Sequence, residues 1–402
     1  MARARFLLIV AVMCVLDAAL LYSEERAKDA AVREPSQTRI FVSGGEGYHT
    51  YRIPSVIVTV RGTVLAFCEG RKQGRGDSGD IDMIVRRSQD GGRTWSGQEV
   101  VWDDGANTCG NPCAVVDRRT GTIFLLMNWN HGDDRESQVI KKTGKDTRRV
   151  FVCRSEDDGR TWSKPIDITT SVKRPEWGWY ATGPGVGIQL NQEKYKHRLI
   201  VPCNNSYDDP NGGLLGGSFN YGSHVIFSDD AGKTWNLSEI IKPSCNESQV
   251  VELSDGRLMM NMRNYGPGRK TRAISISADG GASWGSVFND PQLVEPTCQA
   301  SFLRYTTEAN GRRNRLLFSN PASREGRFKM TVRLSYDEGR NWPVSKLIYA
   351  GPSAYCCLAV LPDGDIACLY EAGKEHPYET ITFARFTLEW LTGGKDSLRK
   401  HD

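Results

Sequence analysis

An arginine at a strand end and the aspartates of a glycine-rich loop are the first residues of this chain that could do chemistry. Arg52 lies in YHTYRIPSVIV, and Asp77, Asp80 and Asp82 lie in EGRKQGRGDSGDIDMIV. A guanidinium group binds carboxylates through planar N–H donors, and a loop carboxylate can exchange a proton with a substrate. Taken alone, Arg52 is better explained as a surface arginine in an exposed salt bridge, and Asp77 is equally well explained as a solvated loop carboxylate.

The surrounding sequence predicts where these side chains lie. Proline disfavours a helix and a central ladder position, so Arg52 is expected where a strand ends. Asp82 is assigned to the strand that follows the loop and Asp80 to its turn. The loop glycines would allow this segment to move over a substrate as a lid.

An acidic motif recurs along the chain, and it resembles a calcium loop only at first sight. Its carboxylates do not fall at alternate positions with a closing glutamate, so we exclude calcium binding. The frame is S-x-D-x-G-x-(T/S/N)-W, and its five copies are SQDGGRTW (88–95), SEDDGRTW (155–162), SDDAGKTW (228–235), SADGGASW (277–284) and SYDEGRNW (335–342).

The frame has the chemistry of a turn between strands. Its aspartate can accept hydrogen bonds from backbone N–H groups of the same turn, and its glycine can adopt a positive φ without steric cost. Its tryptophan has a large apolar area to bury, which we expect to pack one repeat against another. Each copy follows a strand-like run such as IDMIVRRS or RAISIS. The motif is therefore predicted to be structural.

The spacing of the copies predicts the architecture. Their first and last starts lie 247 residues apart, about 62 residues per repeat, which is room for about four short strands. We therefore expect an all-β fold, a six-bladed β-propeller formed by residues 36–392, with five blades carrying the aspartate turn. The sixth blade would combine a strand near TRIFVS with the C-terminal TITFARFTLEWL and so close the ring.

The two ends of the chain differ from this pattern. Residues 1–22, with Arg3 and Arg5 before an apolar run, are typical of a secretory signal peptide, so we expect a secreted or periplasmic protein without a membrane span. Residues 23–35 are expected to be a polar linker and 393–402 a flexible tail. A net charge of +4 is too small to indicate nucleic-acid binding, and most of the 11 cysteines are expected to be buried free thiols.

Three features together resemble the secreted exo-α-sialidases (neuraminidases) of bacteria and animals. They are YRIP at 51–54, the repeated aspartate motif, and LAVLPDGDIACLYE at 358–371. The resemblance covers essentially all of the chain after its first segment. It implies a retaining glycosidase that needs no metal or organic cofactor and acts on sialylated glycoproteins, glycolipids or oligosaccharides as a monomer.

The resemblance also implies which residues bind the substrate carboxylate. Arg52, Arg263 in GRLMMNMRNYG and Arg327 in NPASREGRFKMTVRLS would form a triad of guanidinium groups. Arg324 is the alternative to Arg327. Glu371, at the end of CLYE, would hydrogen-bond Arg52 and fix its orientation.

The catalytic groups implied by the resemblance are Asp77, Glu247 and Tyr355. Tyr355 would be the nucleophile, Glu247 its base and Asp77 the acid/base, in a loop that also contains Arg71. The neighbouring arginines are expected to make the phenol easier to ionise. Asp80 is the alternative to Asp77 and Glu252 the alternative to Glu247.

Further residues are expected around the sugar. Asn111 in CGNPC, Trp129 in LLMNWNHG and Tyr180 in WGWYATGPG resemble pocket residues of the family, whereas Trp177 and Trp179 fit either an aglycone platform or buried strand positions. The charged segment 132–149 is expected to be a solvated loop, and a place at the rim of the pocket is the weaker alternative. Two alternatives to the hydrolase stay open at this point, a trans-sialidase and a non-catalytic sugar-binding propeller.

Overall fold

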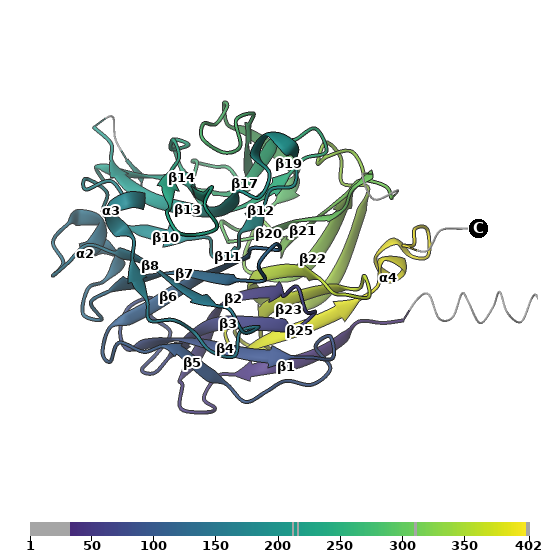
Figure 1. The fold of residues 1–402 in the computed structure, drawn as a ribbon, viewed down its shortest axis with the longest axis horizontal. Coiled ribbons are helices and arrows are strands. Elements are labelled where there is room, and N and C mark those ends of the chain that lie inside the picture. The colour runs from purple at the N-terminus through teal and green to yellow at the C-terminus, as the bar shows by residue number, and fades with distance from the viewer. Residues whose placement is uncertain (1–32, 211–212, 215–216, 309–311, 399–402) are drawn as a thin grey trace, which may run out of the picture.

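The computed structural model describes residues 33–210, 213–214, 217–308 and 312–398, and its regular elements are almost all β-strands (Figure 1). The expected signal peptide and residues 23–32 of the expected linker lie outside the described residues, so export stays a prediction. Of the expected tail, residues 393–398 are described, and Asp396 accepts hydrogen bonds from the guanidinium group of Arg315 at 2.6 and 2.7 Å.

The described strands form four sheets. The first sheet contains β2 (Thr50–Val58), β3 (Val64–Arg71), β4 (Ile81–Ser88), β5 (Glu99–Trp102), β6 (Thr108–Val116), β7 (Ile123–Asn130), β8 (Arg149–Ser155), β9 (Ile166–Asp167) and β11 (Gly185–Val186). The second contains β10 (Tyr180–Thr182), β12 (Ile188–Gln189), β13 (Leu199–Asp208), β14 (Phe219–Ser228) and β15 (Asn236–Leu237).

The third and fourth sheets contain the remaining described strands. The third contains β16 (Cys245–Glu252), β17 (Leu258–Asn264), β18 (Thr271–Ser277) and β19 (Phe288–Val294) in sequence order. The fourth has the order β1 (Ser36–Val42), β25 (Thr380–Phe386), β24 (Ile366–Ala372), β23 (Val344–Val360), β22 (Phe328–Ser335), β21 (Arg315–Pro321) and β20 (Ser301–Thr306).

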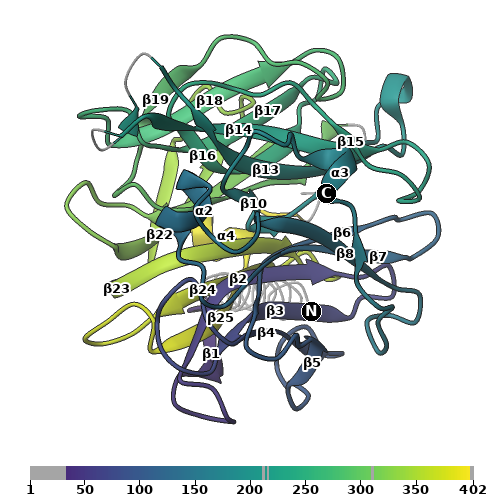
Figure 2. The same cartoon turned by 90° about the vertical axis from the view of Figure 1, so that its left-hand side faces the viewer.

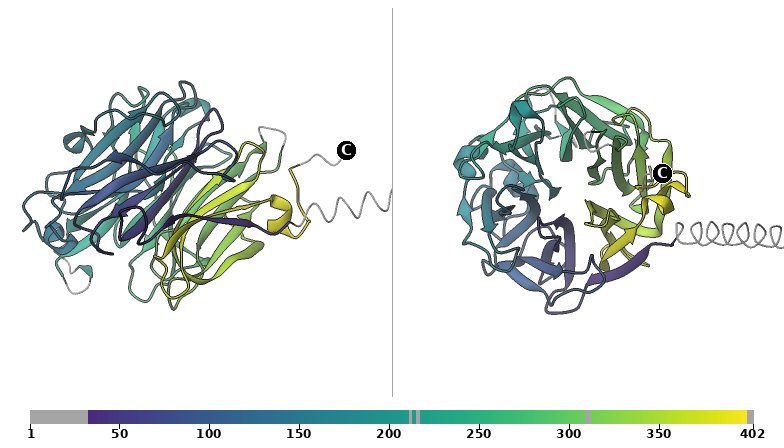
Figure 3. Two further views of the ribbon diagram at one scale, coloured as in Figure 1. Left: turned by 90° about the horizontal axis from the view of Figure 1, so that it is seen from below. Right: turned by 45° about the vertical axis from the view of Figure 1, so that its right-hand side comes forward.

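The larger sheets divide into antiparallel groups. In the first sheet, β2 to β5 and β6 to β9 are joined side to side by the single parallel bridge between Ile81 and Thr108. In the fourth sheet, the long strand β23 pairs with β22 through residues 344–352 and with β24 through residues 353–360. The sheets lie around a common centre, as the ring view in Figure 3 shows.

The two ends of the folded chain close this ring. Strand β1 pairs antiparallel with β25, from Ser36 opposite Arg385 to Val42 opposite Thr380. The predicted pairing of the first strand with the C-terminal strands is therefore confirmed. Figure 2 shows β1 beside β25 at one side of the assembly.

Each of the five repeated motifs forms the same hydrogen-bonded turn. In the second copy the Ser155 hydroxyl donates to Asp157 at 2.9 Å, and the Gly159 N–H donates to Ser155 at 2.9 Å. Asp157 also accepts from the backbone and hydroxyl of Thr161 at 2.9 and 2.6 Å. Gly159 has φ +76°, which only glycine adopts without strain. These side chains are fully occupied within the turn, so they are not available for chemistry.

Four of the five tryptophans of these turns pack against phenylalanines in other parts of the ring. Trp162 meets Phe67 of β3 edge-on at 5.6 Å between ring centres, and Trp95 meets Phe383 of β25 at 5.1 Å. The ten described cysteines are all free and buried, which confirms the expectation for them.

Within the described residues, helical structure is limited to short elements. They are α2 (Glu136–Lys141), α3 (Thr169–Val172), α4 (Leu388–Thr392) and the 3-10 turn η1 (Glu193–Tyr195). None of the helices among the described residues has the length and apolar character needed to cross a membrane.

Candidate active site

Strand ends and loops from several parts of the ring line a pocket of about 290 Å³. Eight residues predicted for the site line it together: Arg52, Arg71, Asp77, Asn111, Glu247, Arg263, Arg327 and Tyr355. Six arginines and four carboxylates are among the lining residues, so positive charge is in excess and the pocket suits an anionic ligand.

A phenol, a carboxylate and a guanidinium group meet at the base of this pocket. The Tyr355 hydroxyl donates to Glu247 Oε1 at 2.5 Å. Arg263 Nη1 donates to Glu247 Oε2 at 2.6 Å and to the Tyr355 oxygen at 3.1 Å. Tyr355 lies near the start of the half of β23 that pairs with β24, whereas Glu247 and Arg263 come from the adjacent strands β16 and β17. A phenolic proton therefore already points at a base.

The pKa of Tyr355 is set by opposing influences. Burial and the negative charge of Glu247 raise the pKa of the phenol well above its usual value, and the nearby arginines Arg263, Arg327 and Arg52 only partly oppose them. The arginines do make the phenol easier to ionise, as predicted, but burial and Glu247 outweigh them. The free site holds a neutral tyrosine, hydrogen-bonded to Glu247.

Glu371 lies behind the pocket and ties three of its parts together. Its side chain is fully buried and accepts from Arg52 Nε at 3.1 Å, which is the predicted contact. It also accepts from the backbone N–H groups of Ile53 at 2.9 Å and Tyr355 at 3.0 Å. One carboxylate thus sets the position of the first guanidinium group relative to the phenol.

Asp77 is positioned by two guanidinium groups. Arg71 Nη2 lies 2.8 Å and Arg52 Nη1 3.3 Å from Asp77 Oδ1. Arg71 also donates to the carbonyl groups of Arg75 and Gly76 at 2.6 and 2.8 Å, so the same side chain fastens the loop. Partial burial opposes ionisation of Asp77, but Arg71 and Arg52 outweigh it and hold the pKa of that carboxyl below its usual range.

Arg327, preferred to Arg324 from the sequence, lies at the pocket. It contributes to the pocket lining, donates to the Tyr378 hydroxyl at 2.6 Å and lies 5.6 Å from the centre of the Tyr355 ring. Its rival Arg324 is exposed and does not line the pocket.

The rival carboxylates also lie elsewhere. Asp80 pairs with Lys72 at 3.0 Å, and Glu252 accepts from the backbone N–H groups of Asn191 and Gln192 at 2.9 and 3.0 Å. Neither is part of the pocket lining.

Two residues expected in the pocket do not line it. For Tyr180 the reason is that neighbouring side chains along a strand face opposite sides. Tyr180 is fully buried and packs against Trp177 and His224, whereas Trp179 and Ala181 on either side of it line the pocket. Trp129 donates from its indole to Asp104 at 2.6 Å, outside the pocket. The predictions for Tyr180 and Trp129 are corrected accordingly.

Several lining residues were not expected from the sequence. Glu69 accepts from Arg71 Nε at 2.9 Å and from the Asn111 N–H at 2.8 Å, so it orders both neighbours. Glu136 and Arg148 come from the segment expected to be a solvated loop, but both line the pocket. The alternation around Trp179 was a usable signal, whereas nothing in the charged segment distinguished Arg148 from its exposed neighbours.

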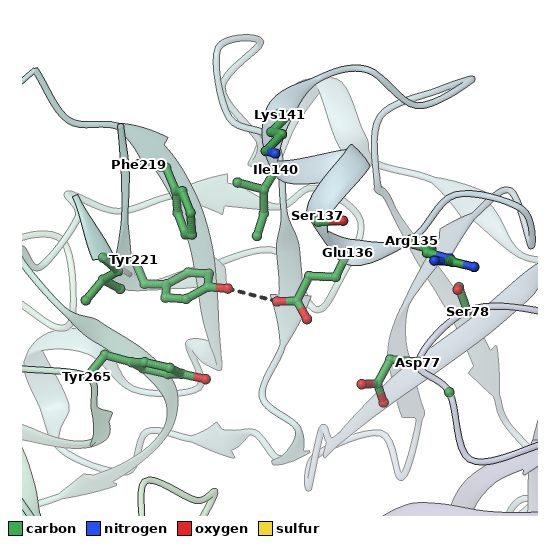
Figure 4. Close-up of a pocket in the computed structure, with 12 residues that line it drawn as sticks. Asp77, Ser78, Arg135, Glu136, Ser137, Ile140, Lys141, Phe219, Tyr221 and Tyr265 are labelled. Carbon is green, nitrogen blue, oxygen red and sulfur yellow. Dashed lines mark hydrogen bonds between the residues drawn. The ribbon is translucent and has the colours of Figure 1, made fainter. Parts of the chain in front are cut away.

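A wider hollow of about 640 Å³ adjoins the charged pocket and shares Asp77, Glu136 and Tyr265 with it. Figure 4 shows the Tyr221 hydroxyl directed at Glu136, a hydrogen bond of 2.8 Å, with Asp77 on the far side of Glu136. Burial raises the pKa of Glu136 above its usual value. This side of the site is more apolar than the arginine side, since Ile140, Leu214 and Phe219 line it.

Comparisons with known proteins agree with this geometry. Residues 62–368 match the family described as the BNR repeat-like domain. A sialidase of Micromonospora viridifaciens is 37% identical to this chain, and the alignment covers 90% of this chain and 55% of that relative. An exo-alpha-sialidase of Aspergillus fumigatus is 31% identical, and the alignment covers 89% of this chain and 88% of that relative. Among solved structures, the Hadza microbial sialidase Hz136 is 30% identical with a TM-score of 0.77, covering 88% of this chain and 69% of that one.

Proposed function

This chain belongs to the sialidase family, and we propose that it is a retaining exo-α-sialidase that releases terminal sialic acid from glycoproteins, glycolipids or oligosaccharides. The observation that carries the proposal is the 2.5 Å hydrogen bond from the Tyr355 hydroxyl to Glu247 beside Arg263. A phenol, a base and a cation at one point are what a tyrosine nucleophile requires.

The substrate carboxylate would bind between Arg52, Arg263 and Arg327. All three guanidinium groups line the pocket, and Arg52 is kept in place by Glu371. Planar guanidinium donors fix the orientation of a carboxylate as well as its charge. The arginines would hold this carboxylate in place beside the anomeric carbon while positive charge develops there.

A tyrosine suits this substrate better than a carboxylate does. Most retaining glycosidases attack the anomeric carbon with Asp or Glu, but sialic acid carries its own carboxylate on that carbon, so an anionic nucleophile would meet like charge. The neutral Tyr355 avoids this repulsion. Its oxygen would form a bond to the anomeric carbon while its proton passes to Glu247.

Asp77 would act first as acid and then as base. In the first step its proton passes to the glycosidic oxygen, and the aglycone leaves as an alcohol. In the second step Asp77 takes a proton from water, which attacks the anomeric carbon, and the bond to Tyr355 breaks as the phenol recovers its proton from Glu247. Arg71 and Arg52 keep the carboxyl ionised in the free site, and the arriving substrate carboxylate would offset their charge and favour protonation.

The proposal includes the expected six blades and a monomeric enzyme. Most of the described strands can be divided into six groups of four. The groups are β2 to β5; β6 to β9; β10 with β13 to β15; β16 to β19; β20 to β22 with the first half of β23; and the second half of β23 with β24, β25 and β1. One chain supplies every group named in the mechanism, which supports catalysis by a monomer.

Replacing Tyr355 by phenylalanine tests the proposal. We expect turnover of an aryl α-sialoside to fall at least about a thousandfold, since the nucleophilic oxygen is lost while the ring still fills its place. Tyr378→Phe is the matched control, because it removes a phenol that contacts Arg327 but no reacting atom. Near-normal turnover by Tyr355→Phe would overturn the assignment, and an anhydro sugar or transfer to lactose, in place of free sialic acid, would contradict hydrolysis.

A further inference from the structure

A separate hollow, here called the β19 hollow, lies between the third sheet and the turn of the fifth aspartate motif. It has a volume of about 280 Å³ and shares no lining residue with the charged pocket or with the wider hollow beside that pocket. Figure 2 shows the three strands that border it, β17, β18 and β19, side by side. The lining residues that give it its chemistry are Met259, Asn261, Ile274, Asp290, Leu293 and Trp342.

Asn261 gives the β19 hollow a hydrogen-bond donor without a partner. The residue is 1% exposed, and its Oδ1 accepts from Arg272 Nε at 2.6 Å. Because a guanidinium group only donates, this contact fixes the amide with Nδ2 at its other end. Nδ2 has no hydrogen-bond partner within the part of the chain that the structure describes. A buried amide in this state has lost its hydration without compensation, which indicates that a ligand supplies the acceptor.

Asp290 gives the same hollow a fixed hydrogen-bond acceptor. Its Oδ2 accepts from the indole of Trp342 at 3.0 Å, and its Oδ1 accepts from the backbone N–H of Gln292 at 2.9 Å. Each oxygen keeps a second lone pair, so the carboxylate can still accept from an N–H or O–H group of a ligand. Its negative charge disfavours an anionic ligand such as free sialic acid.

Apolar side chains complete the β19 hollow. Met259, Ile274 and Leu293 line it, and Phe288, which also lines it, is 50% exposed. An exposed aromatic ring beside a hollow with few polar groups suits a ligand that has an apolar face and a few hydrogen-bonding groups. The volume of about 280 Å³ is near the lower end of the range for ligand sites, about 300–1,000 Å³, and so suits one small ligand.

We propose that the β19 hollow is a non-catalytic sugar site that binds a neutral N-acetylhexosamine residue through its acetamido group. The carbonyl oxygen of that group accepts from Asn261 Nδ2, and its N–H donates to the carboxylate of Asp290. Its methyl group packs on Met259 and Ile274, while the apolar face of the sugar ring lies on Phe288. A donor, an acceptor and an apolar surface in one small hollow match the three parts of an acetamido group. A second sugar site on the same chain would raise its avidity for glycans that reach both sites.

The test titrates the whole chain with N-acetylglucosamine and with glucose, which differ only in the acetamido group, and follows binding by calorimetry. We expect N-acetylglucosamine to bind with a Kd of about 1 mM, as suits one small sugar, and glucose to bind at least about tenfold more weakly. Asn261→Asp keeps the acceptor for Arg272 but turns an oxygen towards the sugar carbonyl, so it should weaken binding of N-acetylglucosamine at least about tenfold.

A second pair of variants tests the exposed ring without disturbing buried residues. Phe288→Ala removes the apolar surface beneath the sugar and should weaken binding of N-acetylglucosamine about threefold or more. Leu347→Ala is the matched control, because Leu347 is 47% exposed on β23 and does not line the β19 hollow. This control should bind N-acetylglucosamine as the wild type does.

The possible results separate this inference from the proposed function. Equal affinity for the two sugars, or unchanged binding of N-acetylglucosamine by a folded Asn261→Asp, would overturn the sugar site. If thermal melting shows that this variant is unfolded, the comparison of Phe288→Ala with Leu347→Ala decides. Hydrolysis of an aryl α-sialoside is measured in parallel: turnover without sugar binding would overturn only the β19 site, whereas sugar binding without turnover would overturn only the proposed function.

Discussion

Replacing Glu371 by glutamine should leave a buried cation without its main counter-ion. Glu371 is fully buried and accepts from Arg52 and from the backbone of Ile53 and Tyr355. Removing one partner of a buried ion pair costs about 3–5 kcal/mol. Glutamine keeps one acceptor oxygen but turns an NH₂ group towards these donors, so we expect a loss of about 3 kcal/mol in the free energy of unfolding. Activity should also fall, because Arg52 and Tyr355 lose their common anchor.

A double-mutant cycle with Arg52→Met measures the pair directly. Equilibrium urea unfolding, followed by tryptophan fluorescence, gives the free energy for the wild type, Glu371→Gln, Arg52→Met and the double variant. The double variant leaves neither charge unpaired, so its loss should be about 1–3 kcal/mol smaller than the sum of the two single losses. Additivity within about 0.5 kcal/mol would refute the claim that Glu371 holds Arg52 in place.

Two further predictions concern ionisation and carboxylate binding. Asp77 must be protonated to act as an acid, and Arg71 and Arg52 hold its pKa low in the free site, so kcat/KM should fall as pH rises through that low value. The substrate carboxylate should raise this pKa in the complex, so the alkaline limb of kcat should lie at higher pH than that of kcat/KM. Alkaline limbs that coincide in the pH profiles of kcat and kcat/KM would contradict the proposed protonation of Asp77. Arg327→Met should lower kcat/KM about ten- to hundredfold, the effect expected from losing a hydrogen bond to a charged group. Arg324→Met, at an exposed position, should leave kcat/KM unchanged. Equal effects of the two substitutions in steady-state assays would mean that Arg327 is not the third arginine.

The all-β fold could be predicted from the sequence because contacts between residues close in the sequence specify its turns. The frame around Asp157 and Gly159 specifies a turn through contacts within eight residues, and its repeat spacing sets the strand content of each unit. Closure of the ring by β1 and β25 followed from counting strands.

The site was predictable only in part, because it depends on which way individual side chains face. Arg52, Asp77, Glu247 and Tyr355 have motifs around them, and the structure brings them together in one pocket. Tyr180 was chosen instead of its neighbour Trp179, which lines that pocket. A shift of one residue along a strand exchanges the two faces.

The charged segment was misjudged for a different reason. Its arginines and acids suggested solvent exposure throughout, but α2 buries Val139 and Ile140, and the fold carries Arg148 into the pocket. Burial of a cation depends on tertiary partners such as Trp179 and Asn111, which are distant in sequence. No local pattern separates Arg148 from Arg149.

Trapping the covalent intermediate tests the central claim most directly. The protein would be incubated with a sialic acid that carries fluorine at C2 and C3, a good leaving group beside an electron-withdrawing substituent that slows hydrolysis of the adduct, then digested and mapped by mass spectrometry. We predict a single sialyl adduct on the Tyr355 oxygen, and no adduct in Tyr355→Phe. An adduct on Asp77 or Glu247 instead would contradict the tyrosine nucleophile on which this mechanism depends.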